Sequence, residues 1–264
     1  MVRVLRPLPV ERLKLLVFDL DGTLIDSARD LCNSVNATLS HFGREPLPGP
    51  VVASFIGDGA QMLVRRALEQ GNKNGTPVEE DFLAQAYACF LDYYRVHKLD
   101  FTYAYAGVLK ALAALRQSPD GRARSMSVLT NKPVRPAQAI CEALNLAPFF
   151  LHVYGGNSFP VKKPDPLGLR TLMDEAGAGP EETVMIGDSE VDVLTARNAG
   201  VWSIGCTFGL AAQSLVDTPP DVLVDSPADW TAALNPAKNE QQSESPFVAR
   251  IRQLANSLSP RSGG

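Results

Sequence analysis

The sequence contains few of the features that build metal clusters, disulfide frameworks or membrane spans. Four cysteines and three histidines occur in 264 residues, and the widely spaced cysteines form no C-x-x-C pair. We therefore expect free thiols in a reducing cytosol and no zinc site. Every apolar run is shorter than the roughly 18 residues of a membrane-spanning helix, and the N-terminal segment is too polar for a signal peptide. These absences predict a cytoplasmic protein without a membrane partner.

An excess of positive charge is also missing. Lysine and arginine total 25, against 29 aspartate and glutamate residues, and the formal net charge is −4. Because nucleic-acid-binding domains present clustered positive charge, we expect no nucleic-acid partner. The remaining composition, 45% hydrophobic and 20% charged, is that of an ordinary globular protein. The length fits one large domain or two small ones, and it leaves monomer and homodimer open.

Short apolar runs alternate with amphipathic patterns along most of the chain. Strands are expected at residues 14–20, 125–130, 152–154, 183–186, 201–206 and 221–224. Helices are expected at residues 28–42, 108–115, 134–146, 167–176 and 191–199. Because parallel strands need crossover connections, this alternation predicts an α/β fold with a Rossmann-like, doubly wound parallel sheet.

One segment interrupts the alternation of strands and helices. From about residue 48 to residue 100 the pattern is helical throughout. We therefore predict an inserted all-helical domain at residues 28–103, and a core domain formed by residues 1–27 and 104–234. Residues 235–264 begin as a polar linker and then place apolar residues at helical spacing, namely Phe247, Ile251, Leu254 and Leu258. This tail is compatible with a short amphipathic helix and equally with a frayed end.

The strongest chemical signal is the pentapeptide Asp19-Leu20-Asp21-Gly22-Thr23, which ends the first predicted strand. Residues i and i+2 of a strand face the same way, so both carboxylates can reach one site. That site lies at the carboxyl end of the sheet, where open α/β folds bind their ligands. Carboxylates this close repel each other unless a cation lies between them, which favours a Mg²⁺ site.

Three later strand ends carry further reactive side chains. Thr130 and Asn131 end the second core strand and can donate hydrogen bonds to a phosphoryl oxygen. Lys163 stands just before a proline and a helix, where its ammonium is a positioned charge. Asp188 leaves the fourth core strand as a candidate metal ligand, and Asp192 follows one helical turn later. Each signal alone is ordinary turn chemistry, but together they converge on one edge of the sheet.

The motifs DLDGT, LTNKP, KKPDP and GDSEVD, in this order, resemble those of the haloacid-dehalogenase superfamily of phosphotransferases. The resemblance covers the chain from about residue 15 to residue 230. It implies a Rossmann-like core with a helical cap that closes over the active site, excludes water and selects the substrate. It also implies Mg²⁺ as the cofactor and a small phosphorylated metabolite as the substrate.

The resemblance assigns a catalytic role to each motif. Asp19 resembles the nucleophile that forms an aspartyl phosphate, and Asp21 resembles the general acid and base. Thr130, with Asn131 beside it, resembles the group that holds the phosphate, and Lys163 resembles the cation that offsets its charge. An aspartate at position 21 fits phosphatases and phosphomutases, so the resemblance implies one of these two activities.

The implied metal site combines residues of the first and the last motif. Asp19, Asp188 and the backbone carbonyl of Asp21 resemble the Mg²⁺ ligands of the superfamily. Asp192 and Ser189 would lie behind these ligands or reach the metal through water. The metal would let an anionic nucleophile approach an anionic phosphate.

The inserted segment is similar to the cap of phosphoglycolate phosphatases at residues 55–60 and 63–68. The candidate substrate-binding residues are Gly22 and Thr23 beside the acid pair, and Arg65 and Arg66 in this segment. Either arginine could bind a substrate carboxylate through two hydrogen bonds, or lie on a solvated helix face. The chain departs from the usual residues of this subgroup at Asp58, Ala106 and Asn157, which bears on the substrate more than on the reaction.

These features together predict a Mg²⁺-dependent phosphomonoester hydrolase, with 2-phosphoglycolate as the first candidate substrate. One alternative is a phosphatase for another small phosphate ester or for pyrophosphate. A second is a phosphomutase similar to β-phosphoglucomutase, which would release an isomerised sugar phosphate instead of free phosphate. A third is a catalytically idle binding protein, although such a protein would have no need for the complete set of catalytic side chains.

Overall fold

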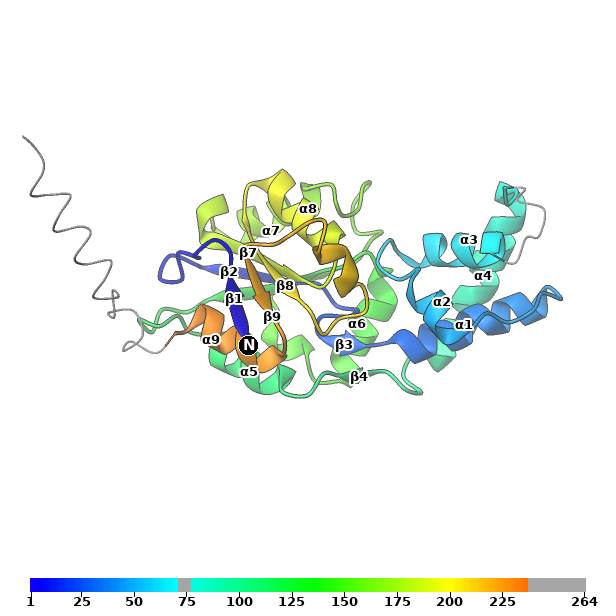
Figure 1. Cartoon of the computed structure of the whole chain (residues 1–264), viewed down its shortest axis with the longest axis horizontal. Coiled ribbons are helices and arrows are strands. Elements are labelled where there is room, and N and C mark those ends of the chain that lie inside the picture. The colour runs from blue at the N-terminus through cyan, green and yellow to red at the C-terminus, as the bar shows by residue number, and fades with distance from the viewer. Residues whose placement is uncertain (71–76, 237–264) are drawn as a thin grey trace, which may run out of the picture.

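The computed structural model describes residues 1–70 and 77–236. Over these residues the chain forms an α/β core with a group of helices beside it (Figure 1). Within these two ranges, no helix combines the length and apolar character needed to cross a membrane. The predicted amphipathic segment of the tail lies outside the described residues, so both alternatives for it stay predictions.

The core is built on a sheet whose strands are parallel except at one edge. In spatial order, the strands that the described residues form are β1 (Val2–Val4), β9 (Val222–Val224), β8 (Trp202–Cys206), β7 (Thr183–Gly187), β2 (Leu15–Phe18), β5 (Ser125–Leu129) and β6 (Val153–Tyr154). The interior strand β2 pairs with β5 and β7, and Leu15 lies opposite both Ser125 and Thr183. Strand β1 is antiparallel to β9. The predicted doubly wound, mostly parallel sheet is confirmed.

Helices cover both faces of this sheet, and alternate residues of β2 contact opposite layers (Figure 1). Leu16 and Phe18 pack with α5 (Val108–Leu115), α6 (Val134–Ala143) and α9 (Pro227–Leu234). Leu15 and Val17 pack with α7 (Leu167–Ala176) and α8 (Glu190–Ala199). All four β2 side chains are fully buried, as is typical of a central parallel strand. The continuous apolar run therefore predicted the position of this strand.

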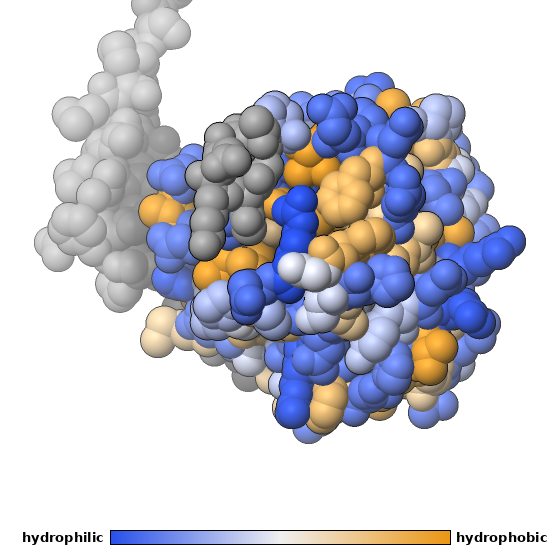
Figure 2. Space-filling view, turned by 90° about the vertical axis from the view of Figure 1, so that its right-hand side faces the viewer, coloured by the Kyte–Doolittle hydropathy of each residue, from blue (hydrophilic) through white to orange (hydrophobic). Residues whose placement is uncertain are grey.

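Between β2 and β5 the chain forms helices that share a hydrophobic cluster of their own. These helices are α1 (Ala28–His41), α2 (Gly49–Ala53), α3 (Ala60–Gln70) and α4 (Glu80–His97). Leu39, Leu68 and Phe90 are fully buried in this cluster. All of its members among the described residues come from the segment between β3 and β4, and none comes from the α/β core. The outer end of the helical group is largely hydrophilic, with smaller hydrophobic areas between the polar side chains (Figure 2).

The chain passes between the core and the helical group through two short strands that lie side by side. Strands β3 (Ile25–Asp26) and β4 (Tyr103–Ala104) pair antiparallel, close to the predicted boundaries at residues 27/28 and 103/104. Asp30, in the first turn of α1, accepts hydrogen bonds from the backbone amides of Phe101 and Thr102. We retain as a proposal the division into a core domain and a cap domain at residues 28–103.

The structure adds short elements that the sequence patterns did not predict. Strand β1 has three residues and β3 and β4 have two each, which is too short for a periodicity to be detected. Helix α9 begins at Pro227 and buries Trp230 against Phe18, with 5.4 Å between the ring centroids. Three short 3₁₀ turns complete the described elements: η1 (Ala147–Phe149), η2 (Pro180–Glu182) and η3 (Ala212–Leu215).

Candidate active site

The predicted catalytic side chains meet where the parallel strands of the core end. Asp19 follows β2, Thr130 follows β5 and Asp188 follows β7, while Lys163 comes from the longer connection after β6. All four residues are buried. The backbone amide of Asp19 donates a 2.8 Å hydrogen bond to the carbonyl of Ile186, which aligns the ends of β2 and β7. Parallel pairing therefore brings residues far apart in the sequence to one edge of the sheet.

The Lys163 ammonium lies between two carboxylates. Its Nζ is 2.9 Å from Asp19 Oδ1 and 2.6 Å from Asp192 Oδ1. The other oxygen of Asp192 accepts hydrogen bonds from the Ser189 amide at 3.2 Å and hydroxyl at 2.7 Å. Burial raises the pKa of Asp19 to about 6, against the opposing effect of Lys163. Lys163 therefore stabilises the nucleophile candidate as a carboxylate, and Ser189 and Asp192 hold Lys163 in place.

Asp188 is enclosed by backbone atoms of two glycine-containing loops. Its Oδ2 accepts a 2.9 Å hydrogen bond from the Ala211 amide, and Thr23 Oγ1 donates to Oδ1 at 3.4 Å. Gly22 has φ of 83°, and a Cβ atom there would lie 2.1 Å from Asp188 Oδ2. A Cβ at Gly209 would lie 2.2 Å from Asp188 Cβ. The loops can therefore close around this carboxylate because neither position carries a side chain.

Three buried carboxylates form a cluster that fits a metal ion. Asp19, Asp188 and Asp192 each offer one oxygen, and these oxygens lie within 4.8 Å of one another. Burial, Asp192 and Asp19 together raise the pKa of Asp188 well above its usual range. Lys163 contacts two of the three carboxylates and balances part of their charge. An additional cation would balance the remainder, and an all-oxygen donor set suits a hard divalent cation.

The side chain of Asp21 lies outside this cluster and contacts a different lysine. Lys132 Nζ donates to Asp21 Oδ1 at 2.9 Å and to Oδ2 at 3.1 Å, and Ser27 Oγ also donates to Oδ1. The same ammonium lies 4.8 Å from the ring centroid of Tyr94, on helix α4. Asp19 and Asp21 thus line one pocket, but each carboxylate has its own buried cation.

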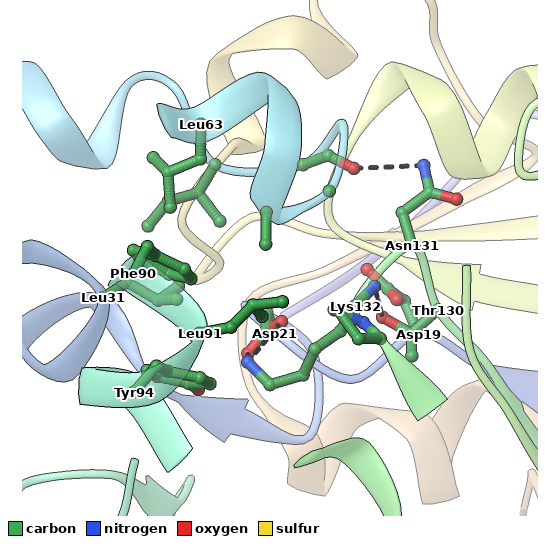
Figure 3. A pocket seen from close by; sticks show the side chains of 15 residues that line it. Asp19, Asp21, Leu31, Leu63, Phe90, Leu91, Tyr94, Thr130, Asn131 and Lys132 are labelled. Carbon is green, nitrogen blue, oxygen red and sulfur yellow. Dashed lines mark hydrogen bonds and ion pairs between the residues drawn. The ribbon is translucent and has the colours of Figure 1, made fainter. Parts of the chain in front are cut away.

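A pocket lies between these strand ends and the helical group (Figure 3). Its core wall is polar and contains Asp19, Asp21, Thr130, Asn131 and Lys132. Its helical wall is mostly apolar and contains Leu31, Ile56, Leu63, Phe90, Leu91 and Tyr94. This arrangement suits a small ligand with one strongly polar end, because the apolar wall displaces water from the polar one.

Asn131 connects the pocket to both of its neighbouring loops. Its Nδ2 donates to the backbone carbonyl of Lys163 at 3.1 Å and to that of Gly57 at 3.2 Å. The adjacent Thr130 hydroxyl accepts a 3.3 Å hydrogen bond from the Lys132 amide. The side-chain nitrogen of Asn131 is therefore occupied in joining the core to the helical segment, and both Asn131 and Thr130 line the pocket.

The comparisons with known proteins agree with this geometry. The family model of haloacid dehalogenase-like hydrolases matches residues 16–206. The chain belongs to this family. A phosphoglycolate phosphatase of Neisseria meningitidis is 35% identical over 237 residues, which are 88% of this chain and 98% of that protein. A phosphoglycolate phosphatase of Pseudomonas putida is 38% identical over 213 residues, 80% of this chain and 76% of that protein.

Solved structures of the family share the fold of this haloacid dehalogenase-like hydrolase. One protein from Haemophilus somnus is described as a predicted phosphoglycolate phosphatase and is 31% identical. It superposes with a TM-score of 0.76 and covers 83% of this chain and 96% of its own. The resemblance stated from the four motifs, and with it the hydrolase class, is confirmed.

The two arginines proposed from the sequence as substrate ligands do not line the pocket of this hydrolase. Arg65 donates to both carboxylate oxygens of Glu80, at 2.8 and 2.9 Å. Arg66 forms an ion pair with Asp58 and donates to the carbonyl of Phe55 at 3.2 Å. Both guanidinium groups are therefore held by partners within the helical segment. Neither arginine lines the pocket that contains Asp19 and Asp21.

Sequence reasoning gave no role to Lys132, which the structure places inside the pocket of this hydrolase. Its side chain is 3% exposed, and 111 residues separate it from Asp21. A signal was present, because Lys132 directly follows Thr130 and Asn131 at the end of a predicted strand. The sequence could not show which of the lysines in these two motifs, at positions 132, 162 and 163, would contact which carboxylate.

Proposed function

We propose that this hydrolase is a Mg²⁺-dependent phosphatase that cleaves small phosphomonoesters through an aspartyl phosphate on Asp19. The observation that carries the proposal is the buried pair of Asp19 and Lys163, in contact at 2.9 Å at the polar end of a pocket. Asp21 lines the same pocket two residues further along the chain. The nucleophile and the proton-transfer group thus line one pocket, and the charge-stabilising cation contacts the nucleophile from behind the pocket wall.

In the first half of the proposed reaction, a carboxylate oxygen of Asp19 attacks the phosphorus atom. A bond forms between this oxygen and phosphorus, and the bond from phosphorus to the ester oxygen breaks. The ester oxygen takes the proton of Asp21 and leaves as an alcohol. Lys163, held by Asp192, offsets negative charge on the phosphoryl oxygens, and the Thr130 hydroxyl donates to one of them.

In the second half, water attacks the phosphorus of the aspartyl phosphate. Asp21 takes a proton from this water, the bond between phosphorus and Asp19 breaks, and inorganic phosphate leaves. The mostly apolar wall of the pocket, which includes Phe90 and Leu91, limits access of further water to the site.

The proposed metal ligands are Asp19 and Asp188 together with the backbone carbonyl of Asp21. Asp192 would support the site from behind, through its contacts with Lys163 and Ser189. Bound Mg²⁺ supplies positive charge that reduces repulsion between an anionic nucleophile and an anionic phosphate. The buried, all-oxygen donor set of this chain supports a hard cation of this kind.

We propose 2-phosphoglycolate as the substrate. Curated relatives from Neisseria meningitidis and Pseudomonas putida carry the name phosphoglycolate phosphatase. A leaving group of two carbons is small, and the pocket that has to hold it together with the phosphoryl group is narrow, with polar side chains on the core wall and mostly apolar ones on the helical wall.

The test is phosphate release from a panel containing 2-phosphoglycolate, ethyl phosphate, sugar phosphates, nucleotides, pyrophosphate and p-nitrophenyl phosphate. Each substrate is measured with Mg²⁺ and with EDTA. Metal-dependent release dominated by 2-phosphoglycolate is the expected result. Release spread over the panel would contradict the substrate, and isomerised sugar phosphate without free phosphate would identify a mutase.

The variant Asp19→Asn tests the mechanism directly. We expect turnover to be abolished while circular dichroism and gel filtration remain those of the folded protein. The matched control is Asp174→Asn, because Asp174 is an exposed aspartate on helix α7. Unchanged turnover in Asp19→Asn would overturn the aspartyl-phosphate mechanism.

A further inference from the structure

The catalytic pocket contains a second buried lysine whose function the four motifs leave open. Within the described residues that line the pocket, Lys132 is the one lysine or arginine. Lys163 is not among these lining residues and is held between Asp19 and Asp192. Ligand atoms beyond the phosphoryl group would therefore meet the charge of Lys132 rather than that of Lys163.

The Lys132 ammonium lies at the junction of the core and the helical group. It contacts both carboxylate oxygens of Asp21, at 2.9 and 3.1 Å, and the ring of Tyr94 on helix α4 at 4.8 Å. Figure 3 shows the Lys132 side chain extending across the pocket to the carboxylate of Asp21, on the side of Tyr94. The ammonium is thus fixed beside the group to which we assign proton transfer to the ester oxygen.

This position determines which part of a substrate comes close to the ammonium. The ester oxygen must approach Asp21 for proton transfer, so the first carbon atoms of the leaving group lie near the same carboxylate. In 2-phosphoglycolate a single methylene separates the ester oxygen from the carboxylate. A carboxylate at that distance lies within reach of a cation that is itself in contact with Asp21.

Among the described residues that line this pocket, no second cation is available to such a group. Leu31, Ile56, Leu63 and Phe90 line the helical side of the pocket. A carboxylate placed against them without a cation would lose its hydration and gain nothing in return. Arg65 and Arg66 form ion pairs with Glu80 and Asp58 outside this pocket. When Asp21 carries the proton that it donates in the proposed reaction, the Lys132 ammonium is the charge that a leaving-group carboxylate meets in this pocket.

We propose that Lys132 is the specificity-determining residue that binds the carboxylate of the leaving group, while it also positions Asp21. The proposal rests on the proposed phosphatase function and deepens it by naming the substrate class. This class is the phosphate monoesters in which one carbon atom separates the ester oxygen from a carboxylate. The proposal gives to a core residue the role that sequence reasoning offered to Arg65 or Arg66. Tyr94 supports the ammonium from the helical side.

The test compares 2-phosphoglycolate with ethyl phosphate, which has the same number of carbons and a methyl group in place of the carboxylate. We expect Lys132→Met to lower kcat/KM about 100-fold for 2-phosphoglycolate and about tenfold for ethyl phosphate. The smaller loss reports the positioning of Asp21, and the tenfold difference between the substrates reports binding of the carboxylate. Equal losses for both substrates, or no loss, would overturn the proposal.

The matched control is Lys110→Met, because Lys110 is an exposed lysine on helix α5, away from the pocket. We expect this variant to retain the wild-type preference between the two substrates. Lys132→Gln provides a second neutral variant if Lys132→Met fails to fold. It should show the same tenfold loss of preference, and a preference equal to that of the wild type would overturn the proposal.

Binding measurements separate this proposal from the proposed function. Calorimetric Kd values for both phosphate esters are measured with Asp19→Asn and with Asp19→Asn/Lys132→Met, in the presence of Mg²⁺. We expect the preference for 2-phosphoglycolate to fall about tenfold when Lys132 is replaced. If the wild type shows no turnover but this fall is observed, the proposed function is wrong and the role of Lys132 stands. If turnover is observed but the preference is unchanged, the role of Lys132 is wrong and the phosphatase stands.

Discussion

Replacement of Lys163 by methionine should destabilise the protein as well as inactivate it. The Lys163 side chain is 3% exposed, and its ammonium contacts Asp19 at 2.9 Å and Asp192 at 2.6 Å. Methionine has a similar length but no charge, so two buried carboxylates would lose their shared cation. Removing one partner of a buried ion pair lowers the free energy of unfolding by about 3–5 kcal/mol. In a protein of this size, we therefore expect the melting temperature to fall by roughly 6–20 °C.

The measurement is thermal and urea denaturation followed by circular dichroism, in EDTA so that no divalent cation compensates. Lys110→Met serves as the control, because Lys110 is exposed and should tolerate the same substitution with little change. A melting temperature of Lys163→Met equal to that of Lys110→Met would refute the reasoning, because it would mean that the two carboxylates need no cation.

A second substitution tests whether the unbalanced charge of the two buried carboxylates causes the loss of stability. In Lys163→Met/Asp192→Asn one of the two carboxylates is neutral, while Asn keeps a side-chain oxygen that can accept the hydrogen bonds of Ser189. We expect the free energy of unfolding of the double variant to be about 2 kcal/mol higher than that of Lys163→Met. A double variant that is less stable than Lys163→Met would show that lost packing, rather than unbalanced charge, dominates.

Three further predictions follow from contacts described above. Gly22→Ala should lower kcat at least tenfold and weaken the dependence of phosphate release on Mg²⁺, measured in a Mg²⁺ titration. The reason is that the added Cβ would lie 2.1 Å from Asp188 Oδ2 and that φ is 83° at this position. A dependence on Mg²⁺ equal to that of the wild type would contradict this prediction. Arg66→Ala should change KM for 2-phosphoglycolate and p-nitrophenyl phosphate by the same factor, because Arg66 pairs with Asp58 outside the pocket; a selective loss with 2-phosphoglycolate would restore its role in binding. Arg124→Ala should lower the free energy of unfolding, measured by urea denaturation, by about 3 kcal/mol and leave kcat unchanged, because the buried guanidinium donates to three backbone carbonyls. An unchanged free energy of unfolding would contradict this role.

Much of the fold was predictable because its signals are local. The run Leu15–Phe18 is apolar at every position, which is typical of a strand buried on both faces, and the alternation of such runs with amphipathic helices indicates parallel crossovers. The strands that the patterns did not predict have two or three residues each. Their existence depends on pairing with distant partners, such as that of Val2 with Val224, and no local periodicity records it.

The candidate site was predictable to the extent that strand order determines it. Asp19, Thr130 and Asp188 each end a core strand, so the carboxyl edge of a parallel sheet brings them together. The surroundings of each side chain were not predictable in the same way. Loop residues such as Gly209 and Ala211 enclose Asp188, although their own sequence carries no recognisable motif.

The sequence by itself determined the family, the order of the catalytic motifs and the edge of the sheet at which they meet. These properties follow from residue type and spacing, which need no knowledge of distant contacts. Only the tertiary structure decided which cation serves which acid: Lys163 contacts Asp19, whereas Lys132 contacts Asp21 across 111 residues of chain. It also placed Arg66 beside Asp58, outside the pocket. The physical reason is that the charge and length of a side chain set which contacts are possible, and packing selects among them.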